Sequence, residues 1–455
     1  MTLTRDDPEL AQTLTRREQM VDYIRAGETP REQWRVGTEH EKLGLSLDTL
    51  EPVPYSGPRG IRALLEVLHR DYGFDPLLEE GNLIGLERQG TSITLEPGGQ
   101  LELAGAPLVT LHETCREFND HIALLKRVSE PLGIVWLGIG LHPLVSTADA
   151  PRIPRQRYTI MREYLGERDE LGLDMMHRTA GVQASFDFSD ETDLALKLRV
   201  ALAASPLQTA LWANSSVSGG KPNGFASRRA YVWRRTDPDR CGLLPFAFEA
   251  GFGADTAYRR YVEWALDVPM FFILREGRHV PMRGRTFRDY FERGFEDWRP
   301  TLADWSLHLT TLFPEVRVKR LIEVRGADAV PPRLVCALPA FWKGIFYDEQ
   351  SLGAAFERLR GWDHAAVDRL HLDVSRAGLS AAAPDDSALG VARELIDLSA
   401  AGLRRQRAMN ASGQDEAIFL EPLYEIVERG TAPCHDLIEN IDGEDSHRLV
   451  EYARY

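Results

Sequence analysis

The chain has 455 residues, which suffices for two or three domains or for one large enzyme fold with additions. Its net charge of −15 argues against a nucleic-acid surface, which normally carries a basic footprint. No run of about 18 apolar residues suggests a membrane span, and residues 1–18 lack the apolar stretch of a secretory signal, so we expect a cytoplasmic protein.

Taken in chain order, the sequence predicts a mixture of helices and short strands. Residues 1–33 form a polar leader that is expected to be helical. Apolar residues recur at steps of four and three from Leu111 to Leu125, which is typical of an amphipathic helix. Further helices are expected at 193–213 and 256–265. Strands are expected at 92–95, 101–103, 134–138, 182–188, 271–274 and 321–324.

Strands in unequal groups between helices favour an α+β architecture over regular βαβ repeats. The stretch 377–386 is rich in Ala, Ser, Pro and Asp and is expected to be a loop. We therefore predict a catalytic domain at 34–386 and a helical C-terminal layer at 387–455 that packs on it.

Several common catalytic and nucleotide-binding motifs are missing. The sequence contains no GxxxxGK[ST] loop, no GxGxxG between a strand and a helix, and no GxSxG elbow. Its four cysteines include no CxxC pair, which makes a zinc site improbable. In a cytosolic protein, reduced thiols are the first expectation.

Acidic residues gather in two segments that border predicted strands. Glu39 and Glu41 lie two residues apart, so on a strand both carboxylates point to the same face. Glu96 and Glu102 bracket a Pro-Gly-Gly turn. One such pair alone is usually a solvated strand face.

A third cluster adds positive charge. Glu323 and Arg325 alternate onto one face of an otherwise apolar predicted strand. Carboxylates that converge repel one another, and Mg²⁺ relieves this because it takes oxygen ligands and bridges them to phosphates. An Arg on the same face suits a phosphate, to which its fork donates two hydrogen bonds. Spacing alone leaves both readings open, a metal–phosphate site and a set of solvated strand faces.

Two further segments carry polar or basic side chains. The stretch Met175–Gly181 is expected to be a loop that leads into a strand, with Arg178 as a phosphate or carboxylate contact and Gln183 as a neutral oxygen ligand. The segment around Lys221 is rich in Gly and Pro and is expected to be a loop with a basic rim. An ordinary exposed glutamine and an ordinary surface turn are the alternative interpretations.

These clusters, in this order, resemble the plant-type glutamate–cysteine ligases, which also occur in proteobacteria. The resemblance runs from about residue 34 to about residue 362, and motifs of this length are specific. It is carried by GTEHEKLG (37–44), SITLEPGGQLELAGAPL (92–108), LGLDMMHRTAGVQ (171–183), GKPNGF (220–225), ALDVPM (265–270), LTTLFPEVRVKRLIEVRGAD (309–328) and CALPAFW (336–342).

The resemblance implies a glutamine-synthetase-like fold in which an antiparallel sheet forms a cleft for ATP and glutamate. It also implies a reaction: ATP and Mg²⁺ activate the γ-carboxylate of L-glutamate as γ-glutamyl phosphate, and the amine of L-cysteine displaces phosphate. This is the first step of glutathione biosynthesis. Relatives of this type are monomers or homodimers, and neither nucleic acid nor membrane is an expected partner.

The resemblance also assigns roles within the site. It implies that five carboxylates bind Mg²⁺ around the nucleotide phosphates: Glu39, Glu41, Glu96, Glu102 and Glu323. Arg325 matches the arginine that contacts the transferring phosphoryl group, so the expected catalytic set is Arg325, Glu323 and Glu41. Nucleotide contacts are expected from Lys221 and Arg178, and substrate contacts from Arg157, Arg229 and Gln183.

The cysteines and one strand show how this chain compares with its relatives. Cys115 and Cys336 match a pair that forms a redox-responsive disulfide in the family; two buried thiols are the alternative. A second family disulfide has no counterpart, since the matching region carries Met282. Ala184 and Ser185 stand where the relatives carry Val and Asn, which affects chiefly the acceptor.

Two other functions are therefore considered beside cysteine ligation. One is a ligase of the same fold that joins glutamate to a different amine. The other is a catalytically silent homologue that binds nucleotide; the retained acidic set and Arg325 argue against it, because a dead homologue has no chemical need for all of them.

Overall fold

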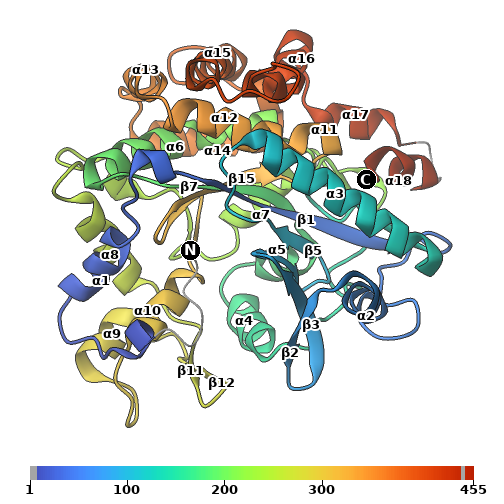
Figure 1. Ribbon diagram of the computed structural model, residues 1–455, viewed down its shortest axis with the longest axis horizontal. Helices are drawn as coiled ribbons and strands as arrows, with labels where there is room; N and C mark the ends of the chain where they lie inside the picture. The colour runs from blue at the N-terminus through green and yellow to red at the C-terminus, as the bar shows by residue number, and fades with distance from the viewer. Residues whose placement is uncertain (1–7, 442–445) are drawn as a thin grey trace.

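A large antiparallel sheet runs through the middle of the computed structural model, which describes residues 8–441 and 446–455 (Figure 1). In this described part the sheet has nine strands in the order β14-β15-β7-β1-β5-β4-β3-β2, with β6 paired to the far end of β1. Their bounds are β1 (Val36–Ser46), β2 (Asp75–Glu79), β3 (Asn82–Arg88), β4 (Thr91–Leu95), β5 (Leu101–Ala104), β6 (Ile134–Leu137), β7 (Gly181–Phe186), β14 (Val316–Val318) and β15 (Ile322–Asp328).

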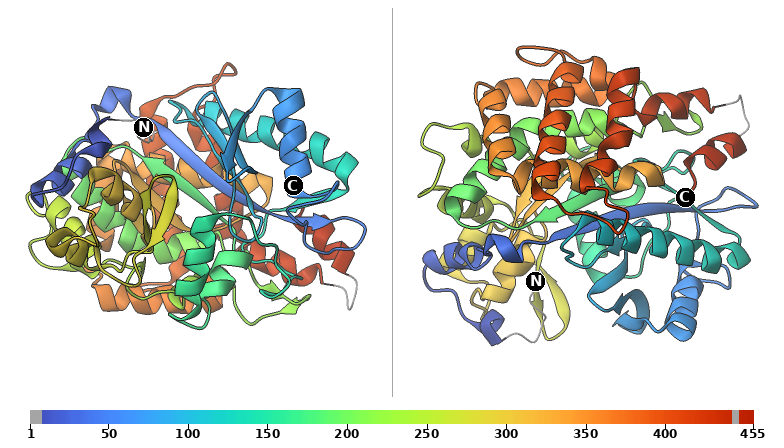
Figure 2. Two further views of the ribbon diagram at one scale, coloured as in Figure 1. Left: turned by 90° about the horizontal axis from the view of Figure 1, so that it is seen from below. Right: turned by 45° about the horizontal axis from the view of Figure 1, so that its top comes forward.

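Helices cover one face of this sheet (Figures 1 and 2). Long helix α6 packs against β15, α12 against β7, and α3 against β1. A second row of helices lies outside them, with α15 on α12 and both α13 and α14 on α6. The bounds are α3 (Leu111–Ser129), α6 (Glu191–Leu211), α12 (Ala337–Phe346), α13 (Glu349–Leu359), α14 (His364–Ala377) and α15 (Ala388–Gln406).

On the other side of the sheet the elements form two groups at its two ends, as Figure 1 shows. One group holds α8 (Ala257–Asp267), α9 (Phe287–Arg293), α10 (Leu302–Leu309) and the hairpin β11 (Phe272–Arg275) and β12 (Arg278–Pro281). The other holds α2 (Ile61–Tyr72), α4 (Gln156–Gly166) and α5 (Gly172–Arg178) beside β2 and β3. The remaining short elements are α7 (Arg228–Arg234), α11 (Pro332–Val335), β8 (Val217–Ser218), β9 (Lys221–Pro222), β10 (Cys241–Gly242) and β13 (Phe313–Pro314).

Strand β1 shows how the sequence sets the two faces of the sheet. Its side chains alternate with the period of two that a strand requires. Thr38, His40 and Lys42 are buried beneath the helical layer, where the His40 ring lies 4.8 Å from that of Phe118 on α3. The residues between them therefore point to the opposite face, which is called the site face below.

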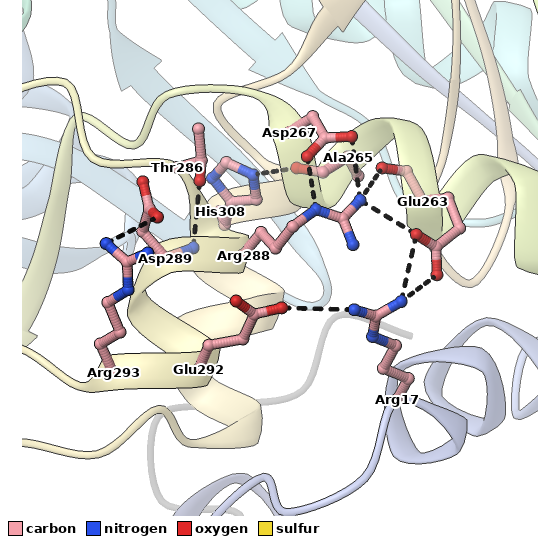
Figure 3. Close-up of polar contacts among 10 residues, drawn as sticks. All are labelled: Arg17, Glu263, Ala265, Asp267, Thr286, Arg288, Asp289, Glu292, Arg293 and His308. Carbon is pink, nitrogen blue, oxygen red and sulfur yellow. Dashed lines mark hydrogen bonds and ion pairs between the residues drawn. The ribbon is translucent and has the colours of Figure 1, made fainter.

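The predicted helical leader contains α1 (Glu18–Arg25), which packs on α8, whereas residues 1–7 lie outside the described part. Figure 3 shows Arg17, just before α1, paired with Glu263 at 3.1 Å and with Glu292 at 3.4 Å. These side chains are about four-tenths exposed, so the pairs contribute little. Burial of apolar residues such as Met20 and Ile24 holds the leader in place.

The C-terminal region continues from α15 with α16 (Glu421–Arg429), α17 (Pro433–Glu439) and α18 (Ser446–Ala453). The buried carboxylate of Glu416 accepts a hydrogen bond from Lys343 of α12 at 2.6 Å and another from the backbone amide of Leu111, at the start of α3, at 2.6 Å. The chain then returns to the sheet, because the amide of Tyr455 bonds the carbonyl of Trp136 in β6. These contacts join residues after 387 closely to the sheet and its first helical layer.

Two cysteines link the first layer covalently. Cys115 of α3 and Cys336, just before α12, form a disulfide with their Cα atoms 5.8 Å apart and a sequence separation of 221. Cys241 and Cys434 are free, and burial raises the pKa of the Cys434 thiol to about 12.

Most of the predicted elements are confirmed to within a few residues, including the α+β class and the strands beside Glu96, Glu102 and Glu323, whereas β1, which carries Glu39 and Glu41, was not among the predicted strands. One prediction was wrong: residues before Gly181 form helix α5 and not a loop. Met175 and Met176 are buried there, and so short a helix shows no clear period. The β2–β3 hairpin was not predicted.

Candidate functional site

Carboxylates from three separate segments meet on the site face of β1. Strand pairing places Glu41 directly opposite Glu102 of β5, and Glu39 directly opposite Gln183 of β7. Paired residues on one face have their Cβ atoms about 5 Å apart. The two-residue spacing and the register together bring these side chains into one group.

Few hydrogen-bond donors offset this acidic group. The amide of Gly181 donates to Glu41 at 2.6 Å, and the hydroxyl of Thr94 donates to Glu102 at 2.9 Å. Burial, together with the charge of Glu96, raises the pKa of Glu41 from 4.5 to about 7. Burial and the neighbouring carboxylates raise the pKa of Glu102 well above its ordinary value. Both carboxyls therefore hold a proton more readily than an ordinary glutamate, and a cation beside them would favour their charged forms.

Glu323 has the opposite surroundings. Its buried carboxylate accepts two hydrogen bonds from Arg317 of β14, at 2.7 and 3.0 Å, and lies 3.4 Å from the ammonium of Lys319. Arg325 donates to it as well. Burial alone would raise the pKa of Glu323, but these three cations hold it well below its usual range. This end of the site face is basic.

Arg325 lies where the acidic and basic ends meet. Its guanidinium donates to Glu323 on its own strand and to the side-chain oxygen of Gln183 on β7. Burial opposes its charge, yet the pKa of Arg325 is raised because Glu323 and Glu39 stabilise the cation. The guanidinium is thus held between the two strands on the site face.

Arg229 reaches the same region from α7. The hydroxyl of Ser227 caps this helix by accepting from Ala230, and the guanidinium of Arg229 donates to the backbone carbonyl of Arg325 at 3.1 Å. Arg229 is 4% exposed, and burial lowers its pKa although the charges of Asp328 and Glu41 act to raise it. It thus adds a second guanidinium beside Arg325.

The structure does not gather all the other predicted residues on this face. Arg178 is engaged by Asp174 at 2.6 Å and by Ser218 at 2.7 Å, at the side of α5. Lys221 is exposed on β9. Arg157, at the start of α4, is buried over aromatic rings, where burial lowers its pKa and the nearby charge of Glu96 acts to raise it.

The donor set of the acidic group suits a hard divalent cation. All its charged donors are carboxylate oxygens, and burial and then the neighbouring carboxylates raise the pKa values of Glu39, Glu41 and Glu102, effects that a bound cation would offset. Across residues 8–441 and 446–455, no three His, Cys, Asp or Glu side chains stand close enough together to hold a metal ion as they are. The fit therefore rests on donor type and charge.

The sequence prediction missed several residues of the site. Arg317 and Lys319 precede Glu323 by six and four residues, and the β14–β15 hairpin turns Arg317 onto it in register. Their alternation in the sequence was a usable signal, but the hairpin had not been predicted. Glu315 and Asp328 were also missed, since a single carboxylate in an apolar stretch has no distinguishing pattern.

The fold and site define the class of the protein: it is an α+β protein with one large antiparallel sheet that carries a charged site on the face opposite its helices. A glutamate–cysteine ligase from Francisella tularensis, solved in complex with AMP, matches with a TM-score of 0.53 over 92% of this chain and 87% of that one, at 12% identity. A bifunctional glutathione synthetase from Pasteurella multocida matches with a TM-score of 0.52 over 96% of this chain and 53% of that one, at 14% identity. These matches concern the fold alone.

Sequence comparison identifies the family. Residues 35–452 match the model of glutamate-cysteine ligase family 2. The chain is 43% identical to the chloroplastic glutamate–cysteine ligase B of Oryza sativa subsp. japonica, over 96% of this chain and 86% of that one. It is also 43% identical to the chloroplastic glutamate–cysteine ligase of Medicago truncatula, over 97% of this chain and 85% of that one. The chain belongs to glutamate–cysteine ligase family 2, and the predicted enzyme class and reaction, the first step of glutathione biosynthesis, are confirmed.

One prediction is contradicted by these relatives. The plant enzymes that match the chain are chloroplastic, so the expectation of a cytoplasmic location was wrong. It rested on the lack of an apolar signal, but targeting segments for chloroplasts are amphipathic, so that lack does not distinguish the two compartments. In the described residues, no helix is both long and apolar enough to cross a membrane.

Proposed function

We propose that the chain joins the γ-carboxylate of L-glutamate to the amine of L-cysteine, with ATP as phosphoryl donor and Mg²⁺ as metal, and that the site face is where they meet. One observation carries this proposal: Arg325 bridges Glu323 and Gln183 directly beside the partly buried carboxylates of β1 and β5. A phosphoryl group that passes between two anions needs both a fixed guanidinium and metal ligands.

The acidic end would hold the metal. Glu39, Glu41, Glu96 and Glu102 are the residues that offer oxygen ligands there, with Glu323 at the border. Mg²⁺ bound to them would neutralise charge on the nucleotide phosphates. Relief of the mutual repulsion that raises the pKa of Glu102 would favour its binding.

The arginines would stabilise the transferring group and the substrate. Arg325 is buried and held by two acceptors, so it is oriented before any ligand arrives, and preorganised charge of this kind is a large term in catalysis. Arg229 would bind an anionic group of glutamate close by. Burial of both guanidiniums keeps water away from an acyl phosphate, which water would hydrolyse.

The decisive experiment is ADP release by the purified protein with Mg²⁺, ATP and glutamate, with and without cysteine, and with product identified by mass spectrometry. We expect cysteine-dependent turnover that yields γ-glutamylcysteine. Arg325→Ala and Glu102→Gln are expected to lower kcat by about 100-fold or more. Arg333→Ala is the control, because this exposed arginine pairs with Glu425 at the surface and its loss is expected to leave turnover unchanged.

Two outcomes would change the proposal. Turnover with another amine and not with cysteine would keep the mechanism and replace the acceptor, consistent with Ala184 and Ser185 on β7. Folded protein that binds ATP but releases no ADP with any amine would support the silent homologue. We also propose that the C-terminal layer beginning near residue 387 is a part of this one enzyme, which its contacts with α12 and β6 support.

A further inference from the structure

Behind Arg229 lies a second group of charged side chains that the catalytic proposal does not use. Glu315, between β13 and β14, is 8% exposed, and its Oε1 lies 3.3 Å from Nε2 of His371 on α14. Arg234, at the C-terminal end of α7, binds both carboxylate oxygens of Asp368 at 2.7 and 3.0 Å. Arg234 also lies 3.4 Å from Nδ1 of His371. A row of polar contacts therefore runs inward from Asp368 at the surface, through Arg234 and His371, to Glu315.

The neighbours of His371 determine which of its ring nitrogens carries the proton. A guanidinium has only donors, so Arg234 requires Nδ1 of His371 to be an acceptor. The ring proton then resides on Nε2, which faces Glu315. The Nε2–H of His371 thus lies close to Oε1 of Glu315 without a well-aligned hydrogen bond, and its positive partial charge, together with Arg229 and Arg234, lowers the pKa of that carboxyl against the effect of burial. Glu315 is therefore a stable anion in the folded protein.

Two glycines make room for the charged groups of Glu315 and Arg229. A Cβ atom added to Gly326 would lie 2.5 Å from Oε2 of Glu315, and one added to Gly181 would lie 2.6 Å from Nη2 of Arg229. Both glycines belong to the central strands β15 and β7. The carboxylate and the guanidinium thus lie directly against neighbouring strands of the site.

The same two side chains line a small cavity next to Arg325. Trp233 and Phe313 complete its wall. Within the described structure, Nε of Arg229, Oε2 of Glu315, Nε2 of His371 and Nε1 of Trp233 are buried and have no hydrogen-bond partner. A buried carboxylate is costly unless it is paired, so the anion there needs a reason beyond packing.

We propose that Glu315, oriented by His371, is a positioning residue that sets the guanidinium of Arg229 for the anionic substrate. Glu315 and Arg229 line the same cavity, and the charges of Glu41 and Glu315 both stabilise the guanidinium, so Arg229 lies between the acidic site and a buried counter-ion. Helix α7 connects the site to His371, because its Arg229 contacts β15 in the site and its Arg234 contacts His371 on α14. The inference rests on the proposed function, in which Arg229 binds an anionic group of glutamate.

Variants of His371 separate positioning from general stability. His371→Leu removes the donor to Glu315, and we expect KM for glutamate to rise about tenfold while kcat changes less than about threefold. His371→Gln keeps an N–H donor, and it is expected to restore KM to within about threefold of the wild type. Gly326→Ala displaces Glu315 without touching the histidine, and it serves as a second variant with the same expected direction.

His308→Leu is the matched control. Like His371 it is 1% exposed, but its Nε2 bonds the carbonyl of Ala265, on α8, at 2.8 Å (Figure 3). It is expected to lower the melting temperature and to leave KM unchanged. If His371→Leu and Gly326→Ala also leave KM unchanged, or if His371→Gln fails to rescue it, the positioning role is wrong.

The outcome can be told apart from a failure of the proposed function. If the wild-type protein releases no ADP with glutamate, the proposed function fails, and positioning is then read from the rise in melting temperature that glutamate and a non-hydrolysable ATP analogue produce. A rise that His371→Leu reduces and His371→Gln restores supports the inference. A rise that is equal in all variants, or absent in the wild type, overturns it.

Discussion

Replacing Glu41 with Gln tests whether the acidic end of the site is strained in the free enzyme. Burial and the charge of Glu96 raise the pKa of Glu41 from 4.5 to about 7. At pH 8 such a shift disfavours the folded, charged form by ~3 kcal/mol, at about 1.4 kcal/mol for each pKa unit. Because Glu41 is only partly buried, we expect a gain of ~1–3 kcal/mol in the free energy of unfolding when its charge is removed.

The sign of the effect depends on pH in a defined way. The folded pKa lies above the unfolded value, so the charge penalty is absent below pH 4.5, grows between 4.5 and 7, and is complete above 7. Glu41→Gln should therefore be more stable than the wild type at pH 8 in EDTA, and the difference should shrink toward pH 5. The same variant should lose about 100-fold or more of its activity, since a metal ligand is missing.

Urea unfolding followed by tryptophan fluorescence measures the stability difference, and ADP release measures activity. Glu323→Gln is the control of opposite sign: its carboxylate pairs with Arg317, Lys319 and Arg325, so its loss should destabilise the protein at pH 8 by ~3 kcal/mol or more. A Glu41→Gln variant that is less stable than the wild type at pH 8, or equally more stable at both pH values, would refute the electrostatic reasoning.

Three further perturbations test other parts of the structure. Arg325→Lys keeps the charge but not the fork that reaches two acceptors, so kcat in the ADP-release assay should fall by about 100-fold. Glu416→Gln leaves the ammonium of Lys343 buried with no anion beside it, and urea unfolding should show a loss of ~3–5 kcal/mol; an exposed pair would lose less than ~1 kcal/mol. Cys115→Ser removes the disulfide to Cys336, which should lower the free energy of unfolding by ~2–5 kcal/mol without reductant. When the wild type and the variant are both fully reduced, their free energies of unfolding should be equal.

Local patterns sufficed for the strands that carry the site. The spacing of Glu39 and Glu41 predicted that both point to one face, and the structure has both on β1 opposite its buried residues. The same reasoning placed Glu323 and Arg325 together, and Arg325 donates to Glu323. A period of two is a property of the strand alone, so no knowledge of the fold was needed.

Pairing between distant segments could not be predicted in the same way. Glu41 meets Glu102 only because β1 and β5 pair in one particular register, and a shift of one residue would send Glu102 to the other face. Arg317 contacts Glu323 only because a hairpin reverses the chain between them. The contact of His371 with Glu315 joins a helix of the outer layer to the sheet, and no periodicity in either segment records it.

The distribution of charge across the sheet explains why the sequence clusters are spread so widely along the chain. Burial and neighbouring carboxylates raise the pKa of Glu102 in the acidic group, whereas three cations surround Glu323, so the two ends of the site differ in charge before ligands bind. Arg325 lies between the ends and is held by one residue from each side, Glu323 and Gln183. A metal on the acidic end and a phosphate against Arg325 would balance both ends at once. Because strands pair side by side, residues nearly 300 positions apart, such as Glu39 and Arg325, can serve one transferring group from a single rigid sheet.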